Sequence, residues 1–264
     1  MIRMLICVLV LMGSQAMAET MRLAVTTSFH NSGLADELLP AVAADTGIEV
    51  QLLVVGTGQA LRLGRAGDVD AILVHSRRAE DAFVAEGFAP HRRDIMYNDF
   101  VLIGPSDDPA NIGAAPDVAT ALRRIADRQA TFVSRGDDSG THRREIALWQ
   151  SAGLTPEGFS AWYKSVGAGM GAALNTATGL SAYILSDRAT WLKFGNKGGL
   201  ALLFDGDAAL FNQYGYLPVS SQRHPHVNGD AAARLEDWLT GPRARALING
   251  YQIDGQQLFI FNAD

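Results

Sequence analysis

Residues 134–142 have the sequence Ser-Arg-Gly-Asp-Asp-Ser-Gly-Thr-His, and they connect a predicted strand over 131–134 to a predicted helix over 139–151. A helix N-terminus offers unpaired backbone N–H groups and a partial positive charge, so it can hold an anion without a surplus of basic residues. Arg135 adds a fork of donors, and Ser139 and Thr141 add hydroxyls. Gly140 lets the backbone come close to a ligand. The segment therefore predicts a site for a small anion.

Two acidic residues lie in the same segment. We expect Asp137 or Asp138 to hold the guanidinium of Arg135 in position. The structural alternative is that Asp138 or Ser139 only caps the helix, while Arg135 forms a surface ion pair. The density of donors favours the anion site.

Strand-like runs and amphipathic helical stretches alternate along the rest of the chain, which is typical of an α/β fold with a largely parallel sheet. We expect strands over 22–26, 50–55, 71–74, 94–104, 131–134, 200–204 and 214–219. We expect helices over 34–46, 80–85, 118–125, 139–151, 172–183, 231–239 and 243–249, with a short helix after residue 58.

The economical arrangement of these elements is two α/β lobes joined by two crossings, near residues 103–105 and 211–217. Residues 19–104 together with 216–264 then form a discontinuous lobe I, and 105–215 form lobe II. Such proteins place their ligand in the cleft between the lobes, at the carboxyl ends of strands.

The first eighteen residues have the features of a secretory signal peptide. A short positive start with Arg3 precedes an apolar run over 4–12, and Ala16-Met17-Ala18 predicts cleavage after Ala18. The run is too short for a membrane span, and the alternative is a retained N-terminal helix. Cys7, the only cysteine, lies in this segment, so the exported chain has no disulfide and no cysteine-based site.

The charge balance excludes polyanionic partners. The chain has 22 Lys and Arg against 28 Asp and Glu, a net charge of −6; loss of Arg3 with the signal peptide leaves 21 against 28, or −7. This balance, without a basic run, argues against nucleic acid and an anionic membrane surface. One dianion in a closed cleft remains compatible, and we expect its capture to depend on short-range donors rather than long-range steering.

Other turns that precede predicted helices are also rich in Ser, Thr and Gly. Thr26-Thr27-Ser28 follows the first strand and Gly-Thr-Gly-Gln-Ala at 56–60 follows the second. Helix capping explains either turn alone, but in two lobes all these turns would point into one cleft. Residues 167–171, Gly-Ala-Gly-Met-Gly, either present backbone N–H groups to the same ligand or serve close helix packing.

Enzymatic and metal sites are less favoured. Ser139 and His142 are the candidates for a secreted serine hydrolase, but the sequence identifies neither an acid partner nor an oxyanion hole. His224 and His226 flank Pro225, which indicates an exposed loop rather than a metal site. Residues 56–58 lack the third glycine of a dinucleotide fingerprint and the Gly-Lys-Ser/Thr of a P-loop. We expect no cofactor and no protein-ligated metal cation.

Together these segments resemble the periplasmic tungstate-binding proteins of ABC uptake systems, which have the type II solute-binding fold. The resemblance covers essentially all of the chain after the signal peptide. Besides residues 134–142, it is carried by Thr26-Thr27-Ser28, Ser32-Gly33-Leu34, residues 55–60, Met-Tyr-Asn-Asp-Phe at 96–100, Gly104-Pro105, Trp162-Tyr163, Gly169-Met170, Ala182-Tyr183 and Asp187-Arg188.

The resemblance implies a set of oxyanion ligands. The side-chain ligands would be Thr27 or Ser28, Thr57, Arg135, Ser139 and Thr141. The backbone donors would be Gly58, Gly140, Gly169 and Met170, with Asp137 and Asp138 supporting Arg135. The sequence departs from the family pattern at Phe29 and Asn31, where Thr and Asp are expected, at Thr178-Gly179, where Glu is expected nearby, and at Ile184 and Ala189. We expect these departures to alter the rim of the site rather than the fold.

The resemblance also implies a function: a non-enzymatic, monomeric periplasmic receptor that closes its lobes over tungstate, or molybdate, and delivers it to a membrane permease. A fully ionised oxyanion only accepts hydrogen bonds, which suits hydroxyls, N–H groups and one arginine. Phosphate is the nearest rival ligand, because phosphate receptors use a similar Arg-x-Asp-x-Ser-Gly-Thr turn. Hydrogen phosphate needs an acceptor, however, and where those receptors place a carboxylate this chain has His75-Ser76.

Overall fold

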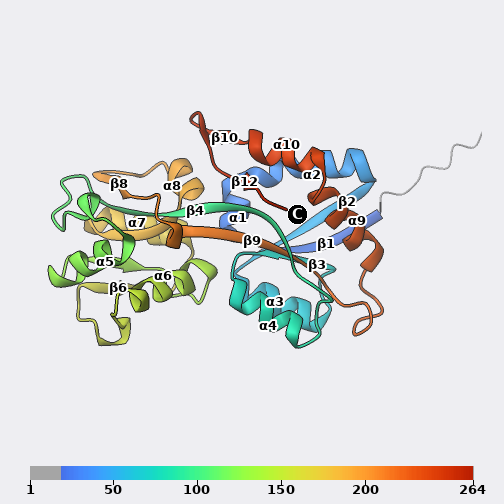
Figure 1. The fold of residues 1–264 in the computed structure, drawn as a ribbon, viewed down its shortest axis with the longest axis horizontal. Helices are drawn as coiled ribbons and strands as arrows, with labels where there is room; N and C mark the ends of the chain where they lie inside the picture. Colours follow the sequence, from blue (N-terminus) through green and yellow to red (C-terminus); the bar gives the residue numbers. More distant parts are fainter. Residues whose placement is uncertain (1–18, 264) are drawn as a thin grey trace, which may run out of the picture.

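The computed structural model describes residues 19–263, which form two α/β lobes lying side by side (Figure 1). The predicted signal peptide 1–18, with Cys7 and the cleavage position after Ala18, lies outside the described residues. Within 19–263, no helix has the length and apolar character needed to cross a bilayer. The expected two-lobed α/β class is confirmed.

Lobe I is built on three parallel strands. Its elements are β1 (Glu19–Thr26), α1 (Thr27–Ser32), α2 (Leu34–Thr46), β2 (Ile48–Val55), α3 (Thr57–Ala66), β3 (Ala71–Val74) and α4 (Arg77–Ala85), followed much later by α9 (Gly229–Leu239), α10 (Pro242–Gly250), the hairpin β10 (Gln252–Ile253) with β11 (Gln256–Gln257), and β12 (Ile260–Phe261). Strand β1 pairs in parallel with both β2 and β3. The carboxyl ends of the three strands therefore lie along one edge of the sheet.

Alternation along β1 explains how helices cover both faces of this sheet. Leu23 and Val25 belong to the core packed against α2, α9 and α10, whereas Ala24 belongs to the core packed against α3 and α4. Figure 1 shows these two groups of helices on opposite sides of the sheet. Strand β3 is buried throughout and continuously apolar, as expected for a strand covered on both faces, whereas the edge strand β2 keeps exposed polar residues.

Lobe II repeats the plan on a smaller scale. Its elements are η1 (Ile112–Ala114), α5 (Val118–Asp127), β5 (Phe132–Ser134), α6 (Gly140–Ser151), η2 (Pro156–Gly158), β6 (Tyr163–Ser165), α7 (Met170–Leu180), β7 (Tyr183–Asp187), α8 (Arg188–Lys193), β8 (Leu200–Phe204) and η3 (Ala208–Leu210). Strand β5 pairs in parallel with β6 and β7. Phe132 packs in the core beneath α5 and α6, and Val133 packs in the core beneath α7.

Two long strands, β4 (Arg93–Pro105) and β9 (Phe211–Pro218), connect the lobes (Figure 1). Strand β4 pairs antiparallel with β9 from Arg93 to Asp99 and with β7 from Phe100 to Ile103. The change of partner between Asp99 and Phe100 comes a few residues before the crossing expected at 103–105. The lobe boundaries 19–104 with 216–264, and 105–215, stay a prediction.

The largest error in the predicted elements lies between residues 172 and 187. The expected helix over 172–183 ends at Leu180, because Ser181 adopts a left-handed conformation (φ 48°), and Tyr183 begins strand β7 instead. Strand β7 is buried throughout and continuously apolar at its start, so its sequence does not distinguish a strand from a buried helix. Strand β6 and helix α8 were also not predicted.

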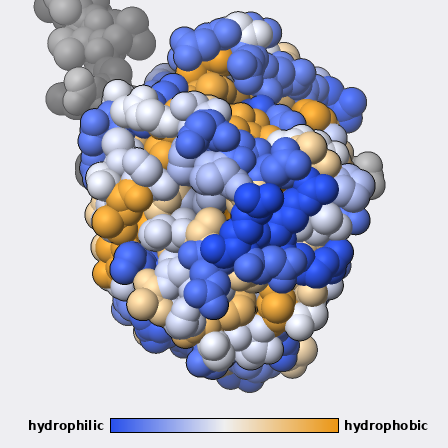
Figure 2. Space-filling view, turned by 90° about the vertical axis from the view of Figure 1, so that its left-hand side faces the viewer, coloured by the Kyte–Doolittle hydropathy of each residue, from blue (hydrophilic) through white to orange (hydrophobic). Residues whose placement is uncertain are grey.

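The outer end of lobe II carries no large apolar surface. Figure 2 looks at this end and shows hydrophilic residues over most of it, with only small separate apolar patches. A face of this kind does not indicate a hydrophobic docking surface.

Candidate functional site

The carboxyl ends of β1, β2, β3 and β5 meet at a small pocket of about 10 Å³ between the lobes. Helices α1, α3 and α6 begin there, and the pocket is lined by Thr26, Thr27, Ser28, Gly56, Thr57, His75, Arg135, Ser139, Gly140 and Thr141. The structure thus brings together all the side chains expected to bind the anion, although their role as ligands stays a prediction. Among the described residues that line the pocket, none carries a carboxylate.

The turn after β1 supplies two hydroxyls to the lobe I side. Thr26 is the N-cap of α1, and its Oγ1 accepts a hydrogen bond from the Phe29 N–H at 3.2 Å. The same Oγ1 lies 3.1 Å from Ser28 Oγ, which in turn lies 3.0 Å from Nε2 of His75. This chain of contacts fixes the Ser28 hydroxyl at the pocket wall.

Thr57, the first residue of α3, is fully buried, and its Oγ1 has no partner among the described residues. The N-cap of this helix is Gly56, which has no side chain to cap the first N–H groups. A buried hydroxyl without a partner is unfavourable unless a ligand or water satisfies it. Thr57 is therefore arranged to donate into the pocket.

His75 follows β3 and is buried between Ser28, Tyr214 and Phe100. Its ring centroid lies 4.9 Å from that of Tyr214 and 6.2 Å from that of Phe100. Its second ring nitrogen, Nδ1, has no partner in residues 19–263. Burial, followed by the charge of Arg135, lowers the pKa of His75 to about 4, so the ring is neutral at pH 7.

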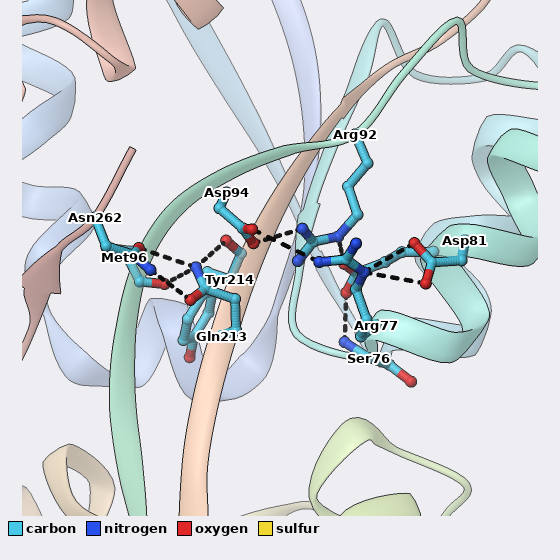
Figure 3. A network of polar contacts seen from close by, with 10 residues as sticks. Ser76, Arg77, Asp81, Arg92, Asp94, Met96, Gln213, Tyr214 and Asn262 are labelled. Atoms are coloured by element: carbon cyan, nitrogen blue, oxygen red, sulfur yellow. Dashed lines mark hydrogen bonds and ion pairs between the residues drawn. The ribbon is translucent and has the colours of Figure 1, made fainter. Parts of the chain in front are cut away.

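A buried ion pair between Arg92 and Glu80 holds the segment that follows His75, and Figure 3 labels Ser76, Arg92 and Asp94 of this network. Glu80 on α4 accepts a hydrogen bond from the N–H of Ser76 and a second one from Arg92 Nε at 2.5 Å. Arg92 also bonds to Asp94 on β4. A Cβ at Gly215 on β9 would lie 2.6 Å from Arg92 Nε, so the crossing strand packs directly on this pair. The start of α4 is thereby fixed relative to both crossing strands.

Arg135 provides the positive charge on the lobe II side. Its side chain is only 4% exposed, and its Nη2 donates a hydrogen bond to Asp137 Oδ2 at 2.5 Å. Asp137 is one of the two aspartates that were expected to hold this guanidinium in position. Burial raises the pKa of Asp137, but hydrogen bonds from Ser139 and Arg135 outweigh it, and the net pKa lies below the usual range. Asp137 is therefore ionised at neutral pH. Nε of Arg135 has no partner among the described residues.

Helix α6 begins at the pocket with Ser139 as its N-cap. Ser139 Oγ accepts from the His142 N–H at 3.2 Å, and Thr141 Oγ1 lies 3.5 Å from Arg135 Nη1, so the hydrogens of both hydroxyls remain available. A Cβ at Gly140 would lie 2.8 Å from His75 Cε1 and 3.1 Å from Thr57 Oγ1. Lobe II thus touches lobe I here, and only glycine fits.

A buried carboxyl group lies behind this helix start. Glu145 accepts hydrogen bonds from Trp149 Nε1 at 3.2 Å and from the Tyr163 hydroxyl at 2.6 Å. Burial raises the pKa of Glu145 to about 7, although these hydrogen bonds act in the opposite direction. Glu145 does not line the pocket, and its role is to hold α6 against the start of β6.

Several expected site residues lie elsewhere. Asp138 does not support Arg135: it has a left-handed backbone (φ 56°), and its exposed carboxylate pairs with Arg143 at 2.9 Å. Gly58, Gly169 and Met170 are not among the residues that line the pocket; Gly58 lines the wider groove outside it, and the other two begin α7.

The departures from the family pattern also lie away from the pocket, contrary to the expectation that they alter its rim. Phe29 points into the core of lobe I and packs against Tyr214, with ring centroids 6.1 Å apart. Asn31 is exposed, Thr178-Gly179 lies at the far end of α7, and Ile184 and Ala189 are buried in the cores of the lobes.

Thr26, Gly56 and His75 line the pocket but were not predicted as site residues. Thr26 and Gly56 are the N-caps that immediately precede residues predicted as ligands. Their omission from the predicted site reflects only where each turn was taken to begin. His75 had a stronger signal, because a polar residue directly follows the fully buried strand β3. A parallel sheet places such a residue at the same edge as the other turns.

The geometry does not support the hydrolase alternative. Nδ1 of His142 accepts a hydrogen bond from the N–H of Asp138 at 3.1 Å, and within residues 19–263 no hydrogen bond joins the His142 ring to the Ser139 hydroxyl. His224 and His226 lie in a loop before α9, and the described residues contain no group of three His, Cys, Asp or Glu side chains that would hold a metal ion.

Comparisons with known proteins show what the whole chain is similar to. A family model described as the PBP superfamily domain matches residues 13–243. The tungstate-binding protein TupA of Peptoclostridium acidaminophilum is 45% identical over 245 residues, which cover 91% of this chain and 85% of that protein.

Two solved structures are similar over nearly their whole length. The tungstate-binding protein TupA from Desulfovibrio alaskensis G20 has a TM-score of 0.83 and 43% identity, over 94% of this chain and 100% of that one. The tungstate ABC transporter structure from Geobacter sulfurreducens has a TM-score of 0.82 and 47% identity, over 88% of this chain and 99% of that one.

Proposed function

This chain belongs to the TupA family of type II periplasmic solute-binding proteins, and from that premise we propose that it captures tungstate in the pocket between its lobes. The family resemblance and the fold class expected from the sequence are thereby confirmed. Capture of an oxyanion for an ABC uptake system is the function of the relatives by name, and the pocket of this chain has the chemistry for the same task.

The observation that carries the proposal is that the pocket offers donors and no carboxylate acceptor. Its lining includes the buried hydroxyls of Ser28, Thr57, Ser139 and Thr141 together with one guanidinium. Tungstate at neutral pH is a fully ionised dianion, and all of its oxygens accept hydrogen bonds. Such an ion satisfies every free donor of the pocket and leaves none of its own groups unpaired.

In this proposal Arg135 supplies the charged contact, and its free Nε and its Nη groups bind the anion. Thr57 and His75 donate to it from lobe I, with Thr27 at the start of α1. With the proton of His75 on Nδ1, Nε2 accepts from the Ser28 hydroxyl, so Ser28 orients the ring, and Nδ1 donates into the pocket. Backbone N–H groups of Gly140 and Thr141, at the start of α6, complete the set.

The same donor set disfavours phosphate. Hydrogen phosphate carries a proton, and binding it without an acceptor leaves that donor unpaired in a buried site. The residue after β3 is a neutral histidine, not a carboxylate. Molybdate, which has the same charge and tetrahedral shape as tungstate, is the second candidate ligand.

We also propose the remaining properties of a receptor. The chain is exported after cleavage at Ala18, works as a monomer in the periplasm, carries no cofactor, catalyses no reaction, and delivers its anion to a membrane permease. Closure of the lobes, which already meet at Gly140, would bury the anion.

Isothermal titration calorimetry with tungstate, molybdate, sulfate and phosphate tests the proposal. We expect tight binding of tungstate and molybdate, with sulfate and phosphate at least about 100-fold weaker, a difference of ~2.7 kcal/mol. Phosphate binding as tight as that of tungstate would refute the argument from donors. Equal or undetectable binding of all four anions would refute the oxyanion site itself.

A further inference from the structure

A groove of about 1240 Å³ lies outside the pocket and opens directly onto it. His75 and Gly140 line both the groove and the pocket. Helices α3 and α4 of lobe I form one wall of the groove, and α6 of lobe II forms the opposite wall. The groove is therefore a route from solvent to the anion site.

The walls of this groove are strongly basic in an otherwise acidic protein. Six arginines line them, against two aspartates, which is an excess of four positive charges. The whole chain, in contrast, has a net charge of −6. The arginines come in pairs, two from each of the three helices: Arg62 and Arg65, Arg77 and Arg78, and Arg143 and Arg144.

Half of these arginines are neutralised locally. Arg65 pairs with Glu86 at 2.8 Å, Arg77 with Asp81 at 2.9 Å, and Arg143 with Asp138 at 2.9 Å. Counting Glu86, which lies outside the groove, still leaves an excess of three positive charges. The other three arginines have no carboxylate within ion-pair distance among residues 19–263. They are Arg62, Arg78 and Arg144.

Contacts among the described residues do not explain why positions 62 and 78 are arginine. Both are exposed; Arg62 bonds only to Gln59 on its own helix, and the described residues give Arg78 no hydrogen bond or ion pair. Arg144 differs, because it is half-buried and its Nη2 bonds to the Phe211 carbonyl on the crossing strand at 2.9 Å. The two exposed arginines are thus the ones whose charge acts mainly on the solvent in the groove.

We propose that this groove, lined by Arg62, Arg78 and the four other arginines, is an electrostatic entry path that speeds capture of a divalent oxyanion. A cleft lined by one sign of charge concentrates the field and raises the local concentration of the opposite ion, which increases association rates by about 10- to 1,000-fold. The inner pocket sets how long the anion stays, and the groove sets how fast it arrives. The inference rests on the proposed function and replaces the expectation that capture uses short-range donors alone.

The test is the association rate of tungstate with Arg62→Gln/Arg78→Gln, measured by stopped flow. Bound tungstate is followed by intrinsic tryptophan fluorescence and, independently, by rapid filtration with elemental analysis of tungsten. The matched control is Arg243→Gln/Arg245→Gln, which removes the same charge from α10 on the opposite face of the lobe I sheet. Each protein is measured at ~10 mM and ~500 mM ionic strength, since screening shortens the reach of the charges from about 30 Å to only a few Å.

At low salt we expect the groove variant to associate about 3- to 10-fold more slowly than the wild type, with a dissociation rate within about two-fold. The control should match the wild type, and the difference should vanish at high salt. An association rate that is independent of salt, or equal in the groove and control variants, would overturn the entry path while tungstate binding itself stands. Absence of tungstate binding by the wild type would instead overturn the proposed function.

Discussion

The two lobes contribute opposite kinds of chemistry to one pocket. Lobe II presents a charge, Arg135, which is held by the ionised Asp137 at 2.5 Å. Lobe I presents only neutral groups: the hydroxyls of Ser28 and Thr57 and the uncharged ring of His75. The charged half is satisfied in part without a ligand. The neutral half keeps two buried groups, Thr57 Oγ1 and His75 Nδ1, that have no partner within residues 19–263.

This difference indicates how affinity and closure are divided between the lobes. An anion gains most of its electrostatic stabilisation from lobe II, because a charged donor forms roughly twice as strong a hydrogen bond as a neutral one. The unpartnered donors of lobe I, Thr57 and His75, would gain a partner from an anion that Arg135 of lobe II also holds. We therefore expect lobe II to determine whether an anion binds and lobe I to determine how tightly the cleft closes.

The largest effect should come from removing the charge of lobe II. Arg135→Ala should weaken tungstate binding about 1,000-fold, or ~4 kcal/mol, because it removes a buried charged donor and leaves Asp137 near the anion. Titration calorimetry measures the loss, with Arg245→Ala as a control that should leave the affinity unchanged. A loss below about ten-fold would mean that the helix ends and hydroxyls suffice, and the contrast between the lobes would be wrong.

Blocking the contact between the lobes should have the next largest effect. In Gly140→Ala the new methyl group would lie 2.8 Å from His75 Cε1 and 3.1 Å from Thr57 Oγ1, so the lobes cannot approach as closely. We expect affinity for tungstate to fall about 100-fold, or ~2.7 kcal/mol. The thermal midpoint without ligand should be nearly unchanged. Gly171→Ala, on α7 with nothing within 4 Å of the new atom, is the matched control. Equal affinities of the two variants would exclude closure at Gly140.

The neutral state of His75 predicts a pH-dependent stability. Its pKa of about 4 lies below the unfolded value of about 6.5, so its contribution is fully present above pH 6.5 and is lost as the pH falls toward 4. Between pH 7.5 and pH 5 the loss should be ~2 kcal/mol. Glu145, with a pKa raised to about 7, acts in the opposite direction over this range.

Comparison of variants separates the two groups. Urea unfolding of the wild type, His75→Gln and the exposed control His30→Gln should be measured at both pH values. The difference between wild type and His75→Gln should change by ~2 kcal/mol, and that between wild type and His30→Gln should not. If His75→Gln has the same pH dependence as the wild type, the histidine is not held neutral by its site.

The smallest effect should come from one neutral hydroxyl, and it should have opposite signs for binding and stability. Thr57→Val keeps the shape of the side chain but removes a buried group that has no partner. We expect tungstate affinity to fall about ten-fold and the free energy of unfolding without ligand to rise by ~1 kcal/mol. Calorimetry and urea unfolding measure the two quantities. A loss of stability would show that the hydroxyl has a structural partner after all.

The sequence predicts this site well where one strand, one turn and one helix are contiguous. Residues 134–142 carry their own strand end, guanidinium and N-cap, so local chemistry was sufficient to expect Arg135, Ser139 and Thr141 together. His75 depends instead on the alignment of β3 with β1 at the same sheet edge, which is a property of the tertiary fold. Asp138 was assigned wrongly because its direction follows from a left-handed backbone that spacing does not reveal.

The same limit applies to the fold. Helices with one apolar face, such as α5 and α9, were predicted close to their bounds, because burial on one side leaves a periodic pattern. Strand β7 is buried on both faces and leaves no such pattern. The basic groove escaped prediction for a related reason: its arginines are spread over three helices and two lobes, and the net charge of the chain conceals them.

The position of β9 has a consequence for the order in which the chain folds. In the sheet, β9 lies between β3 and β4, with the order β2-β1-β3-β9-β4, so the strands on its two sides do not pair with each other. All strands of lobe II other than β4 lie between residues 132 and 204 and can pair as soon as that stretch is available. The sheet of lobe I stays in two parts until residue 218 has arrived, and β12 joins it only with the last residues. As the chain emerges, the lobe that starts first along the chain is therefore the one that finishes last, because its sheet depends on strands that are far apart in the sequence.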